Sequence, residues 1–172
     1  KSSLSLETTY LTYLAHQAGG LSDKMFSDNP FQSNRERNWF EVEWLLYNLK
    51  YNLNLNNKTN ISFSFFGLEA KRNALGFRTN RVDQIDNGEE RDLIKGEFSN
   101  FGFEKRLLKE YKIKNLKSIF LVGFKYYKSN SKSQQGPGSA NKTADFSFDF
   151  NTFPDYVNQS RYEYPNSNFA IF

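Results

Sequence analysis

Cysteine is absent from the sequence, and histidine occurs once, at His16. The lack of cysteine excludes disulfide scaffolds, Cys-based zinc sites and thiol catalysis. A histidine-based metal site needs more than one such ligand. No G-x-S-x-G motif accompanies His16 to indicate a Ser-His-Asp arrangement, so His16 is interpreted as a polar residue at the base of a loop. We therefore expect no enzyme, no metal site and no bound cofactor.

Long apolar runs are also missing. The longest stretch without a charged residue in the first half of the chain, Thr8–Ser22, contains Thr, His, Gln and Gly. A membrane-spanning helix needs about 20 consecutive apolar residues, so none is expected. The net charge is only +4 and no run of basic residues occurs, which argues against a nucleic-acid partner. The chain begins at Lys1 without a signal-peptide pattern, and we expect a processed start or a piece of a longer protein.

Aromatic residues are abundant instead. They make up 17% of a chain that is only 38% hydrophobic, with 18 Phe, 10 Tyr and 2 Trp. The rings and β-branched residues stand in short runs between clusters of Asn, Gly, Ser and Asp, a pattern typical of β-strands. Six strands are predicted, at about Leu4–Leu14, Asn38–Leu55, Asn60–Ala70, Glu97–Ile113, Ser118–Lys128 and from Arg161 to Phe172.

The second predicted strand changes phase along its length. Its first large apolar residues, from Phe40 to Trp44, have even numbers, whereas those from Tyr47 to Leu53 have odd numbers. A bulge near Leu45–Leu46 would bring both sets to one face, and two separate strands are the alternative.

The fifth strand alternates cleanly along its length, which predicts two distinct faces. In the fourth strand, Lys105 and Lys109 lie on the face that otherwise carries rings. They argue against a lipid-facing surface there, unless their charged ends extend beyond it or the face is covered. In the fifth strand Phe120, Val122 and Phe124 are expected to face lipid, and Leu121, Gly123 and Lys125 to face a lumen.

Short and long connections alternate between these strands. The links at Asn56–Thr59 and Lys114–Lys117 are short, whereas those at Ala15–Arg37, Lys71–Gly96 and Ser129–Ser160 are long. Structureless loops above about 12–15 residues are uncommon in compact soluble domains, but outer-membrane barrels combine short periplasmic turns with long external loops. The pattern predicts an all-β chain of antiparallel up-and-down strands that form part of a transmembrane outer-membrane β-barrel. Within the last link, the stretch SNSKSQQGPGS is predicted to be a flexible loop.

Five arginines fall on the long-loop side of the predicted strands. Up-and-down pairing would gather them at one mouth, where planar guanidinium groups suit carboxylates and oxygen ligands of iron. The alternative is that they bind lipopolysaccharide phosphates or pair with acidic residues nearby, such as Glu36, Glu89, Glu90 and Asp92. The candidate ligand-binding residues are Arg35, Arg37, Arg72, Arg78 and Arg81.

Several segments resemble the barrel portion of TonB-dependent outer-membrane receptors, and most closely the ferric-dicitrate or siderophore receptors of Bacteroidetes type. The resemblance extends over nearly the whole chain. It rests on LTYLAHQAGGLSD (Leu11–Asp23), SNRERNWF (Ser33–Phe40), ALGFRTNRV (Ala74–Val82), ERDLIKGEF (Glu90–Phe98), QGPGSA (Gln135–Ala140) and the stretch Asn158–Asn166.

The resemblance implies a 22-stranded barrel with an N-terminal plug and a TonB box, which imports a ferric chelate with energy relayed by TonB. Residues 1–172 show about six strands and neither a plug nor a TonB box, so we expect a barrel segment covering about a quarter of a larger receptor. The implied partners are the rest of the barrel and plug, the TonB complex acting through that plug, and outer-membrane lipid or lipopolysaccharide. The ferric chelate would be a transported ligand and not a cofactor.

Two other readings fit parts of the pattern. One is a complete small outer-membrane barrel of adhesin or porin type, since eight strands fit into a chain of about this length. The other is a soluble β-sandwich that binds glycans with surface aromatics. The long second and fourth strands and the alternation of link lengths argue against the sandwich.

Overall fold

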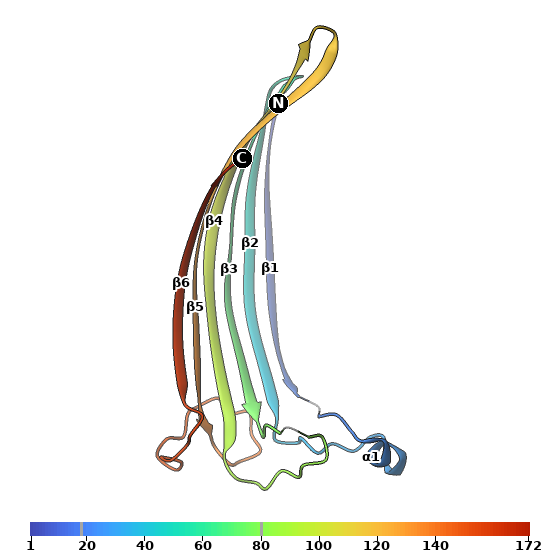
Figure 1. Ribbon diagram of the computed structural model, residues 1–172, viewed down its shortest axis with the longest axis vertical. Helices are drawn as coiled ribbons and strands as arrows, with labels where there is room; N and C mark the ends of the chain where they lie inside the picture. The colour runs from blue at the N-terminus through green and yellow to red at the C-terminus, as the bar shows by residue number, and fades with distance from the viewer. Residues whose placement is uncertain (18, 80) are drawn as a thin grey trace.

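The structure is a computed structural model that describes residues 1–17, 19–79 and 81–172. It contains one short helix and one sheet of six long, curved strands (Figure 1). None of the helices in the described residues is long and apolar enough to cross a membrane. The elements are β1 (Ser2–His16), α1 (Asp23–Asp28), β2 (Trp39–Asn56), β3 (Thr59–Gly76), β4 (Arg91–Ile113), β5 (Leu116–Gly138) and β6 (Ser160–Ile171).

The strands follow one another across the sheet in sequence order, and every neighbouring pair is antiparallel. The all-β, up-and-down prediction is therefore confirmed, as are the tight turns that join β2 to β3 and β4 to β5. Within the described residues β1 and β6 do not pair, so this sheet is neither a closed small barrel nor the two sheets of a sandwich. Both of those alternatives are wrong for this chain.

β1 is slightly longer than the sequence pattern predicted, and three strands extend well beyond their predicted bounds. β3 continues to Gly76 and β4 begins at Arg91, so the connection between them covers only residues 77–90. β5 runs to Gly138 and includes the SNSKSQQGPGS stretch, so the predicted flexible loop is wrong. The composition was misleading because β6 begins only at Ser160, opposite Gln135, which leaves Pro137 on an edge of the sheet where a missing N–H is tolerated.

Glycine lets the next connection fold back onto this end of β5. A Cβ at Gly136 would lie 2.6 Å from the Phe148 ring, and one at Gly138 would lie 2.4 Å from Leu75 Cδ1. The connection touches β5 there, with a single bridge between Gly138 and Phe148. The glycines that indicated a loop in the sequence instead permit close packing against a strand.

The bulge predicted near Leu45–Leu46 does not exist. The pairing of β2 with β3 is continuous there, and the register shifts only between Asn54 and Asn56, beside the turn. Odd and even residues of β2 therefore lie on different faces throughout. The sequence pattern changes phase because one face of the sheet is apolar near the turns and the other face is apolar near the loops.

One face is apolar in the half of the sheet nearer the turns, and we call it the ring face. Phe65 pairs with Leu49 and Phe103, and the same row continues on both sides to the outer strands. Neighbouring rings touch along the sheet, with centroids 5.1 Å apart for Phe103 and Phe124 and 4.6 Å apart for Phe124 and Phe169. The complete row is Leu6, Leu49, Phe65, Phe103, Tyr126 and Phe169.

The face on the other side of the sheet, the opposite face, is polar at this height. The row beside the rings reads Ser5, Lys50, Ser64, Glu104, Lys125 and Ala170. Nearer the loops the opposite face turns apolar, and this is where the even-numbered residues Phe40, Val42 and Trp44 lie. In β5 the predicted split between Phe120, Val122 and Phe124 on one face and Leu121, Gly123 and Lys125 on the other is confirmed.

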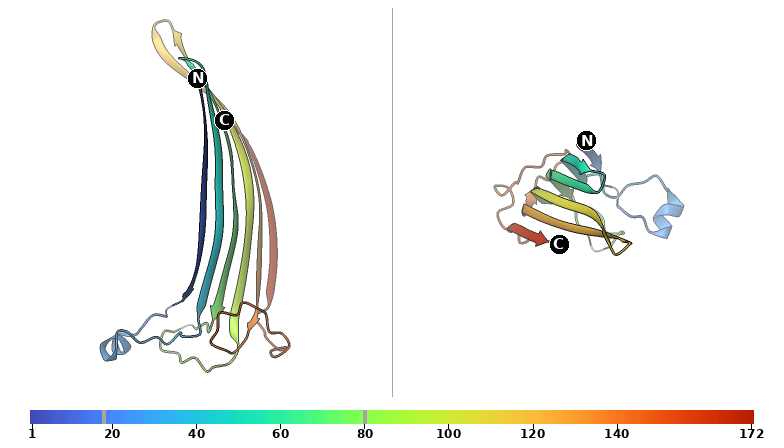
Figure 2. Two further views of the ribbon diagram at one scale, coloured as in Figure 1. Left: turned by 180° about the vertical axis from the view of Figure 1, so that it is seen from behind. Right: turned by 90° about the horizontal axis from the view of Figure 1, so that it is seen from above.

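Burial is concentrated at the loop end. Leu75 and Leu93 are fully buried there, on the ring face under the connection that follows Gly138. The long connections and α1 gather at that end, whereas both chain termini lie toward the turns (Figures 1 and 2). Because the sheet is a single layer elsewhere, large apolar side chains such as Leu6 and Phe65 remain exposed along it.

The β4–β5 turn contains backbone strain that a substitution can relieve. Lys114 and Asn115 have φ values of 50° and 151°, a region that disfavours side chains. We expect Asn115→Gly to stabilise the intact protein by about 1 kcal/mol in thermal unfolding. Asn57→Gly is the matched control in the β2–β3 turn, where the described residues show no positive φ. A stability gain in Asn57→Gly equal to that in Asn115→Gly would contradict this account.

Candidate functional site at the loop end

Three connections meet at one end of the sheet, where β1 leads into β2, β3 into β4 and β5 into β6. They cover residues 17–38, 77–90 and 139–159. All three run off the same end of the strands (Figure 2), as the antiparallel order requires. Of the arginines predicted to bind a ligand, Arg35, Arg37, Arg78 and Arg81 lie in these connections, and Arg72 lies within β3.

Arg37 joins all three connections. Its guanidinium forms a bidentate ion pair with Asp86 and donates to the carbonyls of Glu89 at 2.8 Å and Ala140 at 2.7 Å. The hydrogen bonds from Arg37 hold the pKa of the Asp86 carboxyl below its usual value. Arg37 is only 5% exposed, so its donors are occupied by the protein itself.

Arg91, at the start of β4, reinforces the same junction. It is fully buried and donates to the carbonyls of Arg37 at 2.9 Å, Thr143 at 2.9 Å and Ser139 at 2.7 Å. Burial lowers its pKa from the ordinary arginine value. Arg91 therefore links the first connection to the third through hydrogen bonds, beside the contacts that Arg37 makes with the second connection. Sequence reasoning did not single it out, because its partners lie about 50 residues away along the chain.

Arg35 organises the second connection. It donates to the carbonyls of Gln84 at 3.0 Å and Arg81 at 3.4 Å and to Thr79 Oγ1 at 2.8 Å, and it lies over the Phe77 ring. Like Arg37, it is 5% exposed. The structure thus places two of the five predicted ligand-binding arginines in the framework of the loops. A bound anion would have to displace these contacts.

The other three predicted arginines are exposed. Arg72 lies within β3 on the opposite face, with its Cζ 5.9 Å from the centre of the Phe98 ring. Arg78 follows β3, and its Nε lies 3.8 Å from Asp92 Oδ2. Arg81 pairs with Asp83 at the tip of the second connection. Arg78 also lines a cavity.

That cavity has a volume of about 470 Å³ and lies between the second and third connections. Its polar centre is Asp92, which accepts a hydrogen bond from the Tyr156 hydroxyl and faces Arg78. Burial, together with the bond to Asp92, raises the pKa of Tyr156 to about 12, so its hydroxyl stays a donor at neutral pH. Phe77 and Phe153 contribute rings to the wall. The signal missed in the sequence is Tyr156, which reaches Asp92 across 64 residues.

No other arrangement among the described residues indicates catalysis or metal binding. No group of three His, Cys, Asp or Glu side chains there could hold a metal ion. His16 stacks on the Trp39 ring with centroids 3.7 Å apart, at the base of the first connection.

The fold is similar to one segment of a β-barrel of known structure. In a comparison with solved structures, the chain resembles the crystal structure of the ferric citrate transporter FecA in the unliganded form, with a TM-score of 0.70 and 16% sequence identity. The match covers 98% of this chain and 24% of the FecA chain, so the chain spans about a quarter of that transporter's length. No protein-family model and no curated protein sequence matches the chain.

We expect Arg37→Ala to loosen all three connections together. The substitution leaves the Asp86 carboxylate largely buried without its cation, a loss that typically costs about 3–5 kcal/mol. Hydrogen exchange of the intact protein should accelerate in residues 77–90 and 139–159 while the strands stay protected. Arg81→Ala is the control, because it removes an exposed ion pair worth at most about 1 kcal/mol. Equal exchange in the two variants would contradict a structural role for Arg37.

Proposed function

We propose that this chain is part of the barrel wall of a TonB-dependent outer-membrane transporter that imports an anionic iron chelate. The observation that carries the proposal is a single up-and-down sheet with an apolar ring face and all its long connections at one end. The likeness to the ferric citrate transporter supports the same reading.

The two faces suit the two surroundings of a barrel wall. The ring face would lie against lipid, where side chains must be apolar, and the opposite face would line a polar lumen. Lys105 stands among the rings, but its Nζ lies 5.3 Å from the centre of the Phe63 ring, and its long stem lets the charge reach the membrane surface. The short turns would then be periplasmic and the arginine-rich connections external.

The open edges of the sheet indicate the nearest partner. β1 and β6 each have an unpaired side within the described residues, and unpaired backbone groups cannot face lipid. Further strands of the same barrel would satisfy them, with a plug inside the barrel and TonB acting through that plug. The wall itself has no chemistry to perform, and we propose that it is not an enzyme.

The cavity around Arg78 is the most suitable place for an anionic ligand. The contact of Arg78 with Asp92 is long, at 3.8 Å, and the Arg78 side chain is 59% exposed, so a carboxylate of the ligand could take its place. Arg72, on the opposite face, would extend the positive surface into the lumen. Arg81, at the loop tip, would contribute to the attraction of anions toward the mouth. Ferric citrate or a siderophore would supply the carboxylate or similar oxygen ligands that guanidinium groups recognise.

The membrane orientation predicts a contrast between neighbouring residues of β3. Phe65→Lys places a charge in the middle of the ring face, which costs about 2–4 kcal/mol at the centre of a bilayer. Ser64→Lys is the matched control on the opposite face, between Lys50 and Glu104. We expect the Phe65 variant to be depleted from the outer-membrane fraction of bacteria that express the intact protein, and the Ser64 variant to accumulate normally. If the Ser64 variant were depleted and the Phe65 variant accumulated normally, the assignment of the ring face to lipid would be contradicted.

The capture role predicts a loss of affinity when the exposed arginines are neutralised. In the intact protein, Arg72→Gln combined with Arg78→Gln should weaken ferric dicitrate binding by about tenfold to a hundredfold, since the charge-assisted hydrogen bond from Arg78 alone contributes about 1.5–3 kcal/mol. The salt dependence of binding should fall as well. Arg106→Gln is the control, because Arg106 lies on the opposite face near the turns and pairs with Glu104. Unchanged affinity and salt dependence in the double variant would refute the site.

A further inference from the structure

The second connection contains the one place in the sequence where glycine follows asparagine, the dipeptide Asn87–Gly88. Asparagine is a thermolabile residue, and it is least stable before glycine, because a glycine nitrogen has no neighbouring side chain to keep it from the asparagine side-chain carbonyl. Both residues are exposed, and among the described residues no atom beyond the chain neighbours lies within 4 Å of the position that a Gly88 Cβ would take. Asn87 is therefore a candidate for spontaneous deamidation.

The Asn87 side chain is folded toward the residues that follow it. Its Oδ1 accepts a hydrogen bond from the Glu89 backbone N–H at 3.3 Å, and its Nδ2 donates to Glu89 Oε2 at 2.8 Å. The side chain thus lies on the same side as the Gly88 nitrogen, which is the atom that attacks during deamidation.

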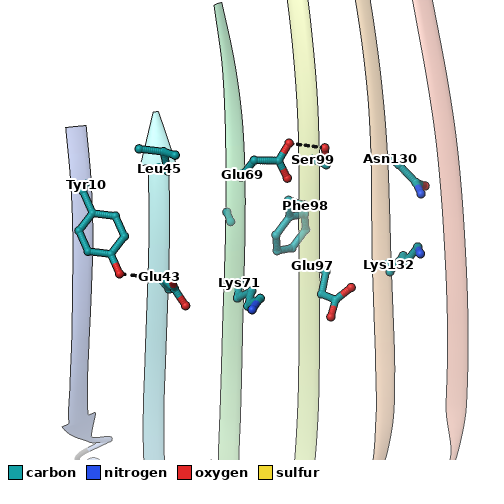
Figure 3. A pocket seen from close by; sticks show the side chains of 11 residues that line it. Tyr10, Glu43, Leu45, Glu69, Lys71, Glu97, Phe98, Ser99, Asn130 and Lys132 are labelled. Carbon is teal, nitrogen blue, oxygen red and sulfur yellow. Dashed lines mark hydrogen bonds between the residues drawn. The ribbon is translucent and has the colours of Figure 1, made fainter. Parts of the chain in front are cut away.

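Asn130 offers a contrast within the same protein. It is followed by the small residue Ser131, but it projects from β5, which has β4 on one side and β6 on the other (Figure 3). A strand that is paired on both sides keeps its backbone extended and uses its N–H groups in the sheet. We therefore expect Asn130 to stay intact under conditions that modify Asn87.

Asp86 restrains the attacking nitrogen of Gly88. The Gly88 N–H donates to Asp86 Oδ1 at 3.0 Å, and the nitrogen has to lose this hydrogen before it can attack. The hydrogen bonds from Arg37, together with the one from Gly88, hold the pKa of the Asp86 carboxyl below its usual value, so the acceptor stays charged. A charged acceptor strengthens the hydrogen bond. The ion pair of Arg37 with Asp86 therefore opposes the first event of deamidation.

The Arg37 guanidinium also holds the chain on both sides of this dipeptide. It pairs with the Asp86 side chain, just before Asn87, and donates to the Glu89 carbonyl at 2.8 Å, just after Gly88. An isoaspartyl residue directs the main chain through the side chain and so adds a methylene between these two points. Arg37 cannot keep both contacts unless the chain between them rearranges.

We propose that Asn87 is a deamidation site that the Arg37–Asp86 ion pair keeps slow, and that isoaspartate at this position releases the second connection from the loop end. The Gly88 nitrogen bonds to Asn87 Cγ, the Cγ–Nδ2 bond breaks, and the hydrogen of the Gly88 nitrogen leaves with Nδ2 as ammonia. Water then opens the succinimide ring to give aspartate or isoaspartate, so no other reactant is needed. The proposal goes beyond the transport function and does not depend on it.

The first test incubates the intact protein at mildly alkaline pH and measures isoaspartate at position 87 by enzymatic methylation and mass spectrometry. We expect Arg37→Ala to deamidate about tenfold faster than the wild type, the factor that one hydrogen bond to a charged group contributes. Arg81→Ala is the matched control in the same connection and should react at the wild-type rate, because Arg81 pairs with Asp83. Asn87→Gln should form no isoaspartate at this position.

The second test uses aged wild-type protein, so that a variant that fails to fold cannot imitate the result. We expect the isoaspartyl form, separated by ion exchange, to show hydrogen exchange several-fold faster in residues 81–90 than the unaged protein. Asn87→Asp adds the same charge without the extra methylene and should exchange like the unaged protein.

Three results would overturn the proposal. They are equal deamidation of Arg37→Ala and Arg81→Ala, a wild-type rate equal to that of the unfolded chain, and equal exchange in the isoaspartyl form and Asn87→Asp. None of them bears on the Phe65→Lys contrast or on ferric dicitrate binding, so the proposed function stands or fails separately.

Discussion

The whole structure depends on the fact that its sheet is a single layer. No second sheet or helix covers either face of the described strands, and side chains two residues apart lie on the same face. Backbone hydrogen bonds between neighbouring strands therefore hold the sheet together. This constraint explains why rings such as Phe65 and Phe103 are exposed although they touch their cross-strand neighbours. An ordinary domain core would have buried them.

The same constraint accounts for how well the sequence predicted the fold. Period-two alternation and turn residues sufficed to place six strands, their order and both tight turns. These signals failed where the composition of a segment was used to predict whether it pairs with a neighbouring strand. SNSKSQQGPGS contains the residues of a loop, yet backbone pairing with β4 extends β5 through it to Gly138. The phase change in β2 suggested a bulge only because one apolar face was assumed for the whole strand.

The candidate site was predictable in position but not in detail. The arginines could be assigned to one end of the sheet because antiparallel order brings alternate connections together. Which arginines are buried and which are exposed could not be predicted from the sequence, because the partners that bury Arg37 and Arg91 lie about 50 to 100 residues away. Arg78 differs from Arg37 because its acidic neighbour, Asp92, is also held by Tyr156 and leaves the guanidinium largely exposed.

The buried arginines at the loop end also bear on how such connections can diversify. Most of the acceptors that Arg37 and Arg91 use in other connections are backbone carbonyls, such as those of Glu89, Ala140 and Thr143. A carbonyl is present whatever side chain the residue carries. Substitutions at those positions can therefore alter the exposed surface of the mouth while the fastening stays intact, provided that the backbone keeps its path. An architecture of this kind lets the exposed surface of the loop end change without rebuilding the sheet that supports it.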